Sequence, residues 1–359
     1  KIRLDHAWFL PKGLVPLSIS MEHVMNDQIL LAHGTGGRLS RALISEYLLQ
    51  ALDNPILRVL DDAATLSLKG RIAFTTDSYV VSPPFFPGGD IGRLAVCGTV
   101  NDLSMAGAEP RYLSLSFILE EGFPLDSLKR IVGSIRTAAE EAGVIIVTGD
   151  TKVVNRGGAD QIFINTAGIG IIPDGIAVSG SAAQIGDKVI LSGPIGDHGI
   201  AVLTQREGLS FESPVKSDVA PLNRLVAAMI DSAADNLHSL RDPTRGGLAT
   251  TLNEFAEQSW VGIRIDESTI PVNEAVRAAC ELLGLDPLYV ANEGKLVAVV
   301  APQKAPAVLS SLTATEYGSQ AAIIGEVVAD HPGKVVLRTR LGSSRVIAML
   351  TGELLPRIC

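Results

Sequence analysis

The sequence predicts a mixed α/β (α+β) protein with two successive domains. Its 359 residues are enough for two hydrophobic cores when a typical domain holds roughly 150 residues. Hydrophobic residues make up 47% of the chain and charged residues 19%, a balance typical of folded proteins. Short β-like runs alternate with helical patterns from His33 to about Gly170, and the alternation then restarts, which indicates a second αβ unit.

The overall charge and the cysteine count exclude several classes of protein. The net charge of −9 and the pI of about 5.2 argue against nucleic acid or an anionic membrane as the main partner. The sequence contains no run of about 18 apolar residues, so no membrane span is predicted. The three cysteines, Cys97, Cys280 and Cys359, lack metal-ligand spacing. We therefore expect a reducing compartment, the cytoplasm, and no disulfide framework.

The expected domains follow from one clear boundary signal. The turn-rich Ile171-Ile172-Pro173-Asp174-Gly175 divides a first domain, 26–173, from a second, 174–340. Residues 341–359 are expected to form a flexible tail, since chain ends are usually weakly held. Residues 1–25 are expected to be a leader or an added extension. They lack the apolar core of a signal peptide, and Met21 or Met25 is a more natural start.

In the first domain, three elements are predicted in order. Arg71–Thr75 is typical of a strand and ends in the acidic Thr76-Asp77-Ser78. Apolar residues then recur at helical spacing from Leu128 to Ala142, with Asp126 as candidate N-cap and Gly143 as candidate C-cap. Val144–Val147 is typical of a buried strand, after which Thr148-Gly149-Asp150 begins a loop, where ligand groups commonly lie.

In the second domain, the elements are a strand, a loop and an amphipathic helix. Lys188–Leu191 is predicted as the strand and Gly193–Gly199 as the loop. The helix has an apolar face formed by Val272, Val276, Ala279, Cys280 and Leu283.

Isolated acidic residues lie at the edges of apolar or glycine-rich segments. They are Asp61, Asp62, Asp77, Asp102 and Asp150. Mg²⁺ prefers oxygen ligands and binds through a few carboxylates together with nucleotide phosphates and water. Several aspartates that converge on one pocket would therefore suit a triphosphate substrate. The alternative is that individual aspartates form turns or cap helices, as Asp often does.

Three glycine-rich loops precede helical patterns, where backbone N–H groups can hold phosphate. None is a Walker A loop, because no Gly-Lys-Ser/Thr follows at the required spacing. Each loop taken alone is more often a plain turn. The loops are His33-Gly34-Thr35-Gly36-Gly37-Arg38, Pro87-Gly88-Gly89-Asp90-Ile91-Gly92 and Asp242-Pro243-Thr244-Arg245-Gly246-Gly247.

Two charged segments are candidates for acid–base or phosphate chemistry. Asn292-Glu293-Gly294-Lys295 lies between apolar runs, where a carboxyl with a perturbed pKa can transfer protons. A surface hairpin is the alternative. In Gly149-Asp150-Thr151-Lys152, Lys152 either binds phosphate or is solvated.

Cys359 follows Pro356-Arg357-Ile358 at the end of the sequence. A thiolate there is a good nucleophile and can carry a covalent group, although an incidental unpaired cysteine is the simpler reading of the residues alone. Cys97 and Cys280 lie on apolar faces and are expected in the core.

Taken together, these segments resemble the HypE family of [NiFe]-hydrogenase maturation, in order and over nearly everything after about Asn26. The C-terminal cysteine sets that family apart. The matching segments are Leu31-Ala32-His33-Gly34-Thr35-Gly36-Gly37, Asp77-Ser78-Tyr79-Val80, Phe85-Phe86-Pro87-Gly88-Gly89, Gly149-Asp150-Thr151-Lys152-Val153-Val154, Gly196-Asp197-His198-Gly199, Asp242-Pro243-Thr244-Arg245-Gly246-Gly247, Asn292-Glu293-Gly294-Lys295-Leu296 and Pro356-Arg357-Ile358-Cys359.

The resemblance implies a PurM-like fold, shared with aminoimidazole ribonucleotide synthetase. Its N-terminal domain has a sheet that pairs in a homodimer, and an α+β C-terminal domain follows. It also implies ATP in the cleft, Mg²⁺ held by aspartates, and dehydration of a carbamoyl group on Cys359 to a thiocyanate. The implied partners are the HypF carbamoyltransferase, which loads the cysteine, and a HypC–HypD scaffold, which takes the cyanide to iron.

Residue roles carried over on the motif match are expectations. Cys359 carries the group, Glu293 is the proton acceptor, and Lys152 assists on phosphate or on the amide. Asp62, Asp77, Asp102 and Asp150 are metal or phosphate-site residues, and the weaker candidates for nucleotide contacts are His33, Gly36, Gly37, Asp197, Thr244 and Arg245. A small-molecule kinase or phosphate synthetase of the same superfamily, or a non-catalytic scaffold, remains as an alternative.

Overall fold

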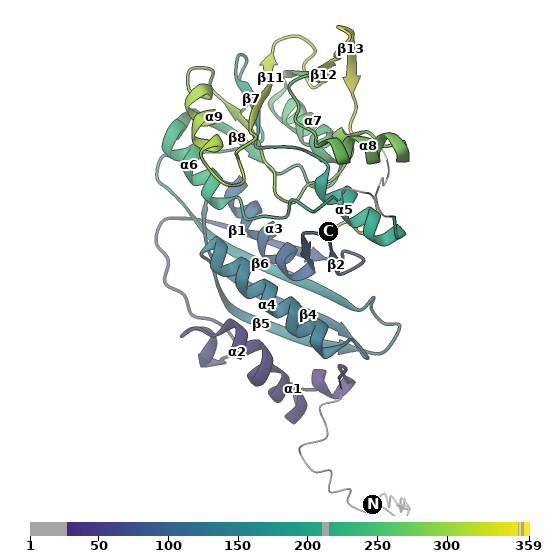
Figure 1. The fold of residues 1–359 in the computed structure, drawn as a ribbon. Helices are drawn as coiled ribbons and strands as arrows, with labels where there is room; N and C mark the ends of the chain where they lie inside the picture. Colours follow the sequence, from purple (N-terminus) through teal and green to yellow (C-terminus); the bar gives the residue numbers. More distant parts are fainter. Residues whose placement is uncertain (1–26, 210–214, 351, 353–354) are drawn as a thin grey trace, which may run out of the picture.

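A computed structural model describes residues 27–209, 215–350, 352 and 355–359 of the chain. The expected leader, 1–25, lies outside these residues. The described chain forms two αβ domains, one above the other in the view of Figure 1, and the C-terminal end lies between them. The mixed α/β class predicted from the sequence is confirmed.

The N-terminal domain is a four-stranded sheet in the order β1-β6-β4-β5, in which only β4 and β5 run parallel. Two helices, α3 and α4, cover one face of this sheet, and α1 and α2 lie beside its β5 edge (Figure 1). The elements are η1 (Leu31–Gly34), α1 (Arg38–Leu43), η2 (Ile44–Leu48), α2 (Leu49–Leu52), η3 (Leu57–Val59), β1 (Arg71–Tyr79), β2 (Phe85–Phe86), β3 (Gly89–Asp90), α3 (Ile91–Met105), β4 (Glu109–Glu120), α4 (Leu125–Ala142), β5 (Ile145–Val154) and β6 (Ile162–Ile172).

Helix α3 is the central element of this domain. Asp90 caps it by accepting hydrogen bonds from the N–H groups of Gly92 and Arg93, at 2.9 and 3.0 Å, which satisfies two donors that a helix start leaves free. Cys97 lies on this helix and is fully buried, as predicted. At Gly92 an added Cβ would lie 2.6 Å from the carbonyl oxygen of Ile131, so the close packing of α3 on α4 requires glycine there.

The opposite face of the N-terminal sheet is open in the described chain. On β1 and β4, apolar side chains on this face remain exposed, among them Ile72, Phe74 and Ile118. Ile145 on β5 joins them. Because side chains alternate between the two faces of a strand, one face packs on α3 and α4 while the other presents an apolar surface.

The C-terminal domain is a seven-stranded sheet in the order β13-β12-β9-β11-β7-β10-β8. Helices α6 and α9 pack on one face in one apolar cluster, and α7 packs on the other in a second cluster. The elements are β7 (Lys188–Leu191), α5 (Asp197–Glu207), α6 (Asn223–Ala233), η4 (Ala234–Asn236), β8 (Leu237–Arg241), α7 (Gly247–Ser259), β9 (Gly262–Asp266), α8 (Glu274–Leu283), η5 (Pro287–Tyr289), β10 (Val297–Val300), α9 (Ala305–Thr313), β11 (Ala322–Val328), β12 (Val335–Arg338) and β13 (Ser344–Ile347).

Several sequence predictions need correction. The strand predicted to end at Thr75 continues to Tyr79, and the strand predicted to end at Val147 continues to Val154. Asp77 and Asp150 therefore lie within strands, because ladder pairing with β6 and β4 overrides their turn preference. Asp126 lies inside the first turn of α4, where it pairs with Lys129, and Pro124 holds the N-cap position.

Other predictions hold in detail. Gly143 caps α4 in the left-handed conformation, at φ 73°. The strand Lys188–Leu191 has its predicted bounds, and α8 buries Val276, Ala279 and Cys280. Each of the three glycine-rich loops leads into a helix, α1, α3 or α7. Within the described residues, no helix has the length and apolar character needed to cross a membrane.

Candidate active site

The end of the chain lies in the cleft between the two domains. The N–H of Val80 donates to the backbone oxygen of Cys359 at 3.1 Å, and the N–H of Ser82 donates to the backbone oxygen of Arg357 at 3.2 Å. The side chain of Ile358 is only 3% exposed. Residues 341–359 were predicted to form a flexible tail, but Ser344–Ile347 form strand β13 at the edge of the C-terminal sheet. The structure describes residues 355–359 in a docked position.

The thiol of Cys359 is held in its neutral form by its surroundings. Its pKa is raised to about 12, chiefly by burial and then by the nearby carboxyl of Glu293. Arg245 acts in the opposite sense, and Asp77 adds to the increase. The thiol therefore lies inside the cleft, close enough to both Glu293 and Asp77 to feel their charges.

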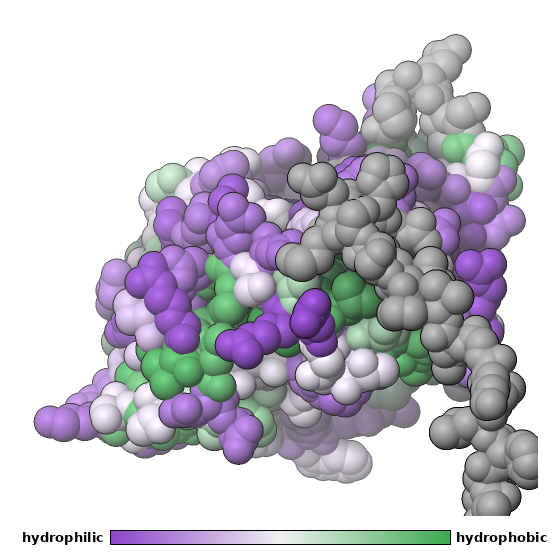
Figure 2. Space-filling view, turned by 90° about the horizontal axis from the view of Figure 1, so that it is seen from below, coloured by the Kyte–Doolittle hydropathy of each residue, from purple (hydrophilic) through white to green (hydrophobic). Residues whose placement is uncertain are grey.

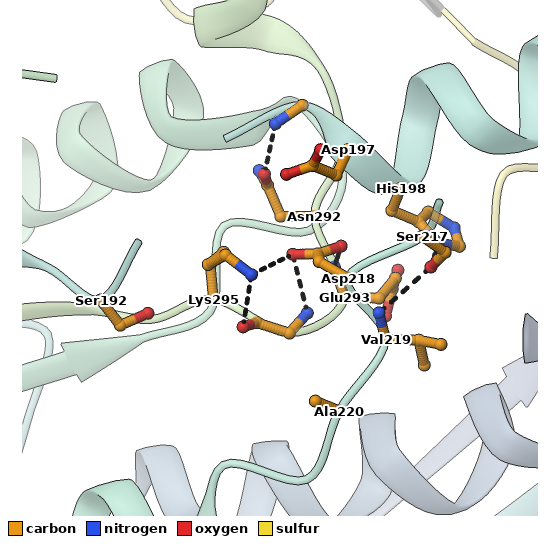
Figure 3. A network of polar contacts seen from close by, with 12 residues as sticks. Ser192, Asp197, His198, Ser217, Asp218, Val219, Ala220, Asn292, Glu293 and Lys295 are labelled. Carbon is orange, nitrogen blue, oxygen red and sulfur yellow. Dashed lines mark hydrogen bonds and ion pairs between the residues drawn. The ribbon is translucent and has the colours of Figure 1, made fainter. Parts of the chain in front are cut away.

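Glu293 belongs to a buried polar segment and not to a surface hairpin. Its side chain is 4% exposed, and its backbone N–H donates to Asp218 at 3.1 Å, as the N–H of Gly294 does at 3.2 Å. Figure 3 shows this segment folded around Asp218. Burial raises the pKa of Glu293 well above its ordinary value, and Asp242 and Asp218 raise it further.

An ion pair between Lys295 and Asp218 stabilises the segment 292–295. The Nζ of Lys295 lies 3.1 Å from a carboxylate oxygen of Asp218, and both side chains are buried. The Lys295 charge lowers the pKa of Asp218 although burial acts to raise it. A buried carboxylate with a cation and two backbone donors is fully compensated, so Asp218 fixes the position of Glu293 (Figure 3).

A cluster of carboxyl groups lies next to Glu293. The pKa of Asp102 is raised to about 6, chiefly by burial and also by the charge of Asp77. Burial also raises the pKa of Asp242 to about 7, with Asp102 and Asp77 both contributing. Asp77, from β1, and Asp102, from α3, thus share this region with Asp242, which follows β8.

These carboxyl groups fit a divalent cation in one respect only. The neighbouring carboxylates repel one another, and a cation between them would relieve this repulsion. However, within the described ranges no three acidic, histidine or cysteine side chains are close enough to hold a metal ion. The arrangement therefore suits an ion held by one or two carboxylates together with phosphate oxygens and water, which is the usual coordination of Mg²⁺.

A second cavity, of about 530 Å³, lies between the segment 33–65 and strand β5. Apolar residues of α2, η2 and η3 form much of its wall, and Figure 2 shows apolar surface between polar side chains on this side of the molecule. His33, Gly36, Asp150 and Lys152 also line it. Asp150 and Lys152 form an ion pair at 3.0 Å and are both largely exposed.

The predicted site residues therefore fall into two groups. Asp77, Asp102, Glu293, Arg245 and Cys359 meet in the cleft, whereas His33, Gly36, Asp150 and Lys152 line the cavity, with Gly37 beside it at the N-cap of α1. Strand β1 is separated from β5 by β6 and β4. Three strand spacings put Asp77 on β1 about 14 Å from Asp150 on β5 within one chain.

Three further predicted residues lie outside both groups. Asp62 is exposed and its neighbours Asp61 and Ala63 line the cavity. Asp197 opens α5 and accepts two hydrogen bonds from Asn273, and burial raises its pKa to about 6. Thr244 precedes Arg245 in the loop before α7. The expected convergence of all four metal-site aspartates on one pocket does not occur within a single chain.

Four residues at the cleft were not selected from the sequence, although two of them lie inside quoted motifs. Asp242 and His198 were quoted as motif members without a role, while Asp218 and Arg206 carried no local signal. Each acts through a partner distant in sequence, such as the Glu293 segment or the tail. Only an isolated charge beside an apolar run could have marked Asp218.

Replacing Asp242 with asparagine is expected to change how stability depends on pH. The pKa of Asp242 is about 7 in the folded chain against an ordinary value of 3.8. The folded state therefore keeps a proton that the unfolded state releases, and the stabilisation present below pH 3.8 is lost as the pH rises through about 7. The amide does not titrate, so Asp242→Asn should gain on the order of 2 to 4 kcal/mol relative to the parent between about pH 4 and pH 8.

Thermal unfolding at about pH 4 and at about pH 8 measures the difference in stability between Asp242→Asn and the parent. Asp174→Asn, at an exposed position, is the matched control and should follow the parent. Parallel stability profiles for Asp242→Asn and the parent would contradict the assigned charge cluster.

Comparisons with known proteins agree over most of the chain. Residues 60–172 match the family model of the AIR synthase related protein N-terminal domain, and residues 184–338 match that of its C-terminal domain. The carbamoyl dehydratase HypE of Rhizobium leguminosarum bv. viciae is 56% identical over 337 residues, which are 94% of this chain and 96% of that protein.

Solved structures give the same answer. A crystal structure of hydrogenase maturation protein HypE in complex with ATP superposes with a TM-score of 0.89 at 54% identity, covering 92% of this chain and 99% of that one. HypE from a HypE–HypF complex superposes with a TM-score of 0.76 at 51% identity, covering 86% and 100%. The chain therefore belongs to the HypE family of carbamoyl dehydratases, the hydrogenase maturation proteins built from two AIR synthase related domains.

Proposed function

We propose that this chain dehydrates a carbamoyl group on its own Cys359 to a thiocyanate, with ATP as the source of free energy. The observation that carries the proposal is the position of the Cys359 thiol. It lies inside the cleft, where the charges of Glu293 and Asp77 both act on it.

The proposed reaction balances as S-carbamoyl cysteine plus ATP giving S-cyanocysteine, ADP and phosphate. The carbamoyl oxygen attacks the γ-phosphorus of ATP, and the bond to the bridging oxygen breaks to release ADP. The carbon–oxygen bond then breaks with phosphate as the leaving group. Both N–H protons leave, one to Glu293 and the other to the departing phosphate, so that the carbon–nitrogen triple bond forms. Phosphorylation thus converts oxygen from a poor leaving group into a good one.

Glu293 is the proposed acceptor for a proton from the carbamoyl nitrogen. The backbone of its segment is held in place by hydrogen bonds from the N–H groups of Glu293 and Gly294 to Asp218, and a general base acts from such a fixed position. It must be ionised to accept the proton, although its surroundings favour the neutral form. Mg²⁺, held by Asp77 and Asp102, would supply charge compensation for the transferred phosphoryl group.

The cavity beside β5 is the proposed nucleotide site. Its apolar wall suits a base, and the loop containing His33, Gly36 and Gly37 leads into α1. Lys152, which also lines this cavity, is the proposed contact to phosphate, and a related HypE structure holds ATP. Asp62, Asp150, Asp197, Thr244 and Arg245 remain proposed contacts around the nucleotide or its metal.

A homodimer through the open face of the N-terminal sheet would resolve the separation of the two groups. Ile72 and Phe74 on β1 are 52% and 69% exposed on that face, and an exposed apolar sheet face is typical of an interface. Pairing two such faces would bring the cavity of one protomer toward the cleft of its partner. Lys152 would then reach the carbamoyl group from the other subunit.

Placing a charge on this face should prevent the homodimer. Phe74→Asp would bury an unpaired carboxylate, which costs several kcal/mol, so the dimer should weaken by about 10²-fold or more. Size-exclusion chromatography with light scattering measures the mass directly. Leu282→Asp, at an equally exposed apolar residue on α8, should stay dimeric. An unchanged dimer in Phe74→Asp would remove this interface.

The proposed partners follow from the same chemistry. HypF, seen in a complex with a related HypE, would place the carbamoyl group on Cys359. A HypC–HypD scaffold would receive the cyanide for the iron of [NiFe]-hydrogenase. A free thiol that must remain reduced suits the cytoplasm.

Phosphate release tests this function against its alternatives. We expect release from ATP only after HypF has carbamoylated Cys359. A small-molecule kinase would release ADP with a free substrate and no carbamoylation, and a scaffold would release no phosphate under any loading. Either result would overturn the proposal.

A further inference from the structure

The docked tail is held through its backbone and not through the side chains of its last residues alone. On the N-terminal domain, Val80 and Ser82 donate to the backbone oxygens of Cys359 and Arg357. The Nε of Arg357 donates in return to the carbonyl of Val80 at 3.0 Å. The donors Val80 and Ser82 are two residues apart, as are the acceptors Arg357 and Cys359, so a one-residue slip of the tail would misalign both bonds.

Arg206, on helix α5 of the C-terminal domain, binds the same segment of the tail. The Nη1 and Nη2 of Arg206 donate to the carbonyls of Pro356 and Arg357, both at 2.7 Å, and its Nε donates to the carbonyl of Ser82 at 2.8 Å. One planar guanidinium thus joins two carbonyls of the tail to one of the N-terminal domain. A lysine lacks the fork needed to make these bonds together.

His198, also on α5, holds the residue next to the cysteine. Its Nε2 lies 2.7 Å from the carbonyl oxygen of Ile358. A carbonyl only accepts, so Nε2 carries the proton. Burial lowers the pKa of His198, so the ring is neutral and Nδ1 accepts from the hydroxyl of Ser217, at 2.8 Å.

The orientation of this ring is itself fixed. The Oγ of Ser217 accepts from the N–H of Val219 at 3.1 Å, which directs its own proton toward Nδ1 of His198 (Figure 3). Phe86 packs edge to face on the imidazole, with centroids 5.3 Å apart. The tautomer that donates to the tail is therefore selected before the tail docks.

We propose that Arg206 and His198 are positioning residues. By binding the backbone carbonyls of the tail they hold it in one register and so place the Cys359 sulfur in the cleft. Ile358 supplies the apolar anchor, since it joins the buried core cluster that contains Val202 and Ala291. Because contacts from both domains meet on the tail, docking requires the domains in their present arrangement. The inference concerns docking, and it rests on the proposed function only where dehydration is the readout.

Alkylation of Cys359 by iodoacetamide tests the inference without any turnover. The docked thiol is neutral and partly buried, so the undocked tail reacts faster. Arg206→Gln removes both guanidinium bonds to the tail and should raise the alkylation rate about tenfold or more, since bonds to charged donors are the stronger class. Ser217→Ala removes the hydrogen bond that fixes the tautomer of His198. The alkylation rate should therefore increase, but by less than in Arg206→Gln.

Peptide mapping assigns the label to Cys359 and not to the buried Cys97 or Cys280. Arg136→Gln, on the exposed side of α4, is the matched control and should react at the parent rate. Thermal unfolding of each variant confirms the fold. Equal alkylation rates for Arg206→Gln, Arg136→Gln and the parent would overturn the inference.

Dehydration gives a second readout that separates positioning from stability. With carbamoylated protein, Arg206→Gln should lower kcat and leave KM for ATP unchanged, and Arg206→Lys should restore only part of the loss. An unchanged kcat would overturn the positioning role. A parent protein that never forms thiocyanate would instead overturn the proposed function, and the alkylation comparison would still decide the docking role.

Discussion

Replacing Cys359 with alanine is expected to abolish carbamoyl-dependent phosphate release while ATP still binds. The sulfur is the only proposed acceptor for the carbamoyl group, and its removal leaves nothing to dehydrate. The tail should still dock, because its contacts are made by the backbone and by Ile358. Calorimetry with ATP and a phosphate-release assay after incubation with HypF measure the two properties separately.

Cys280→Ala is the matched control for this variant. Cys280 is buried on α8 in an apolar cluster of the C-terminal domain, and its loss should leave the reaction intact. If Cys359→Ala turned over ATP with a free small-molecule substrate at the parent rate, the kinase alternative would replace the proposal.

Glu293→Gln is expected to slow dehydration by about 10² to 10⁴-fold, the usual contribution of a positioned base. The carboxamide matches the carboxylate in shape but cannot take up a proton. The backbone bonds to Asp218 do not depend on the side chain, so the segment should keep its conformation and ATP should bind as before. Single-turnover kinetics on carbamoylated protein measure the step itself.

The pH dependence adds a second criterion for Glu293. Because the surroundings raise its pKa, the ionised fraction and the parent rate should increase as the pH rises, and Glu293→Gln should lack this increase. Glu281→Gln, at an exposed position on α8, should behave as the parent. Equal rates for Glu293→Gln and the parent would remove Glu293 from the mechanism.

Local pattern predicted the elements whose cause is local. The apolar spacing of α4 and its glycine cap needed no tertiary information, nor did the strand at Lys188–Leu191. The strand ends were predicted too short at Thr75 and Val147, because Asp77 and Asp150 favour turns and only their pairing with β6 and β4 keeps them extended.

The site was predictable to the extent that motifs marked it. Glu293 and Cys359 were selected from the sequence, and the structure brings them together. Lys152 was selected as well but lies on the far edge of the sheet, since strand order places β5 opposite β1. Asp218 and Arg206 could not be found this way, because each acts on a segment more than 70 residues distant.

Intact mass spectrometry of the parent protein, before and after ATP is added to the carbamoylated form, tests the central claim most directly. We expect the mass added by carbamoylation to fall by that of one water molecule, and peptide mapping to place the change on Cys359. A carbamoyl mass that persists on Cys359 while ATP is consumed, or a water loss at another residue, would contradict this account.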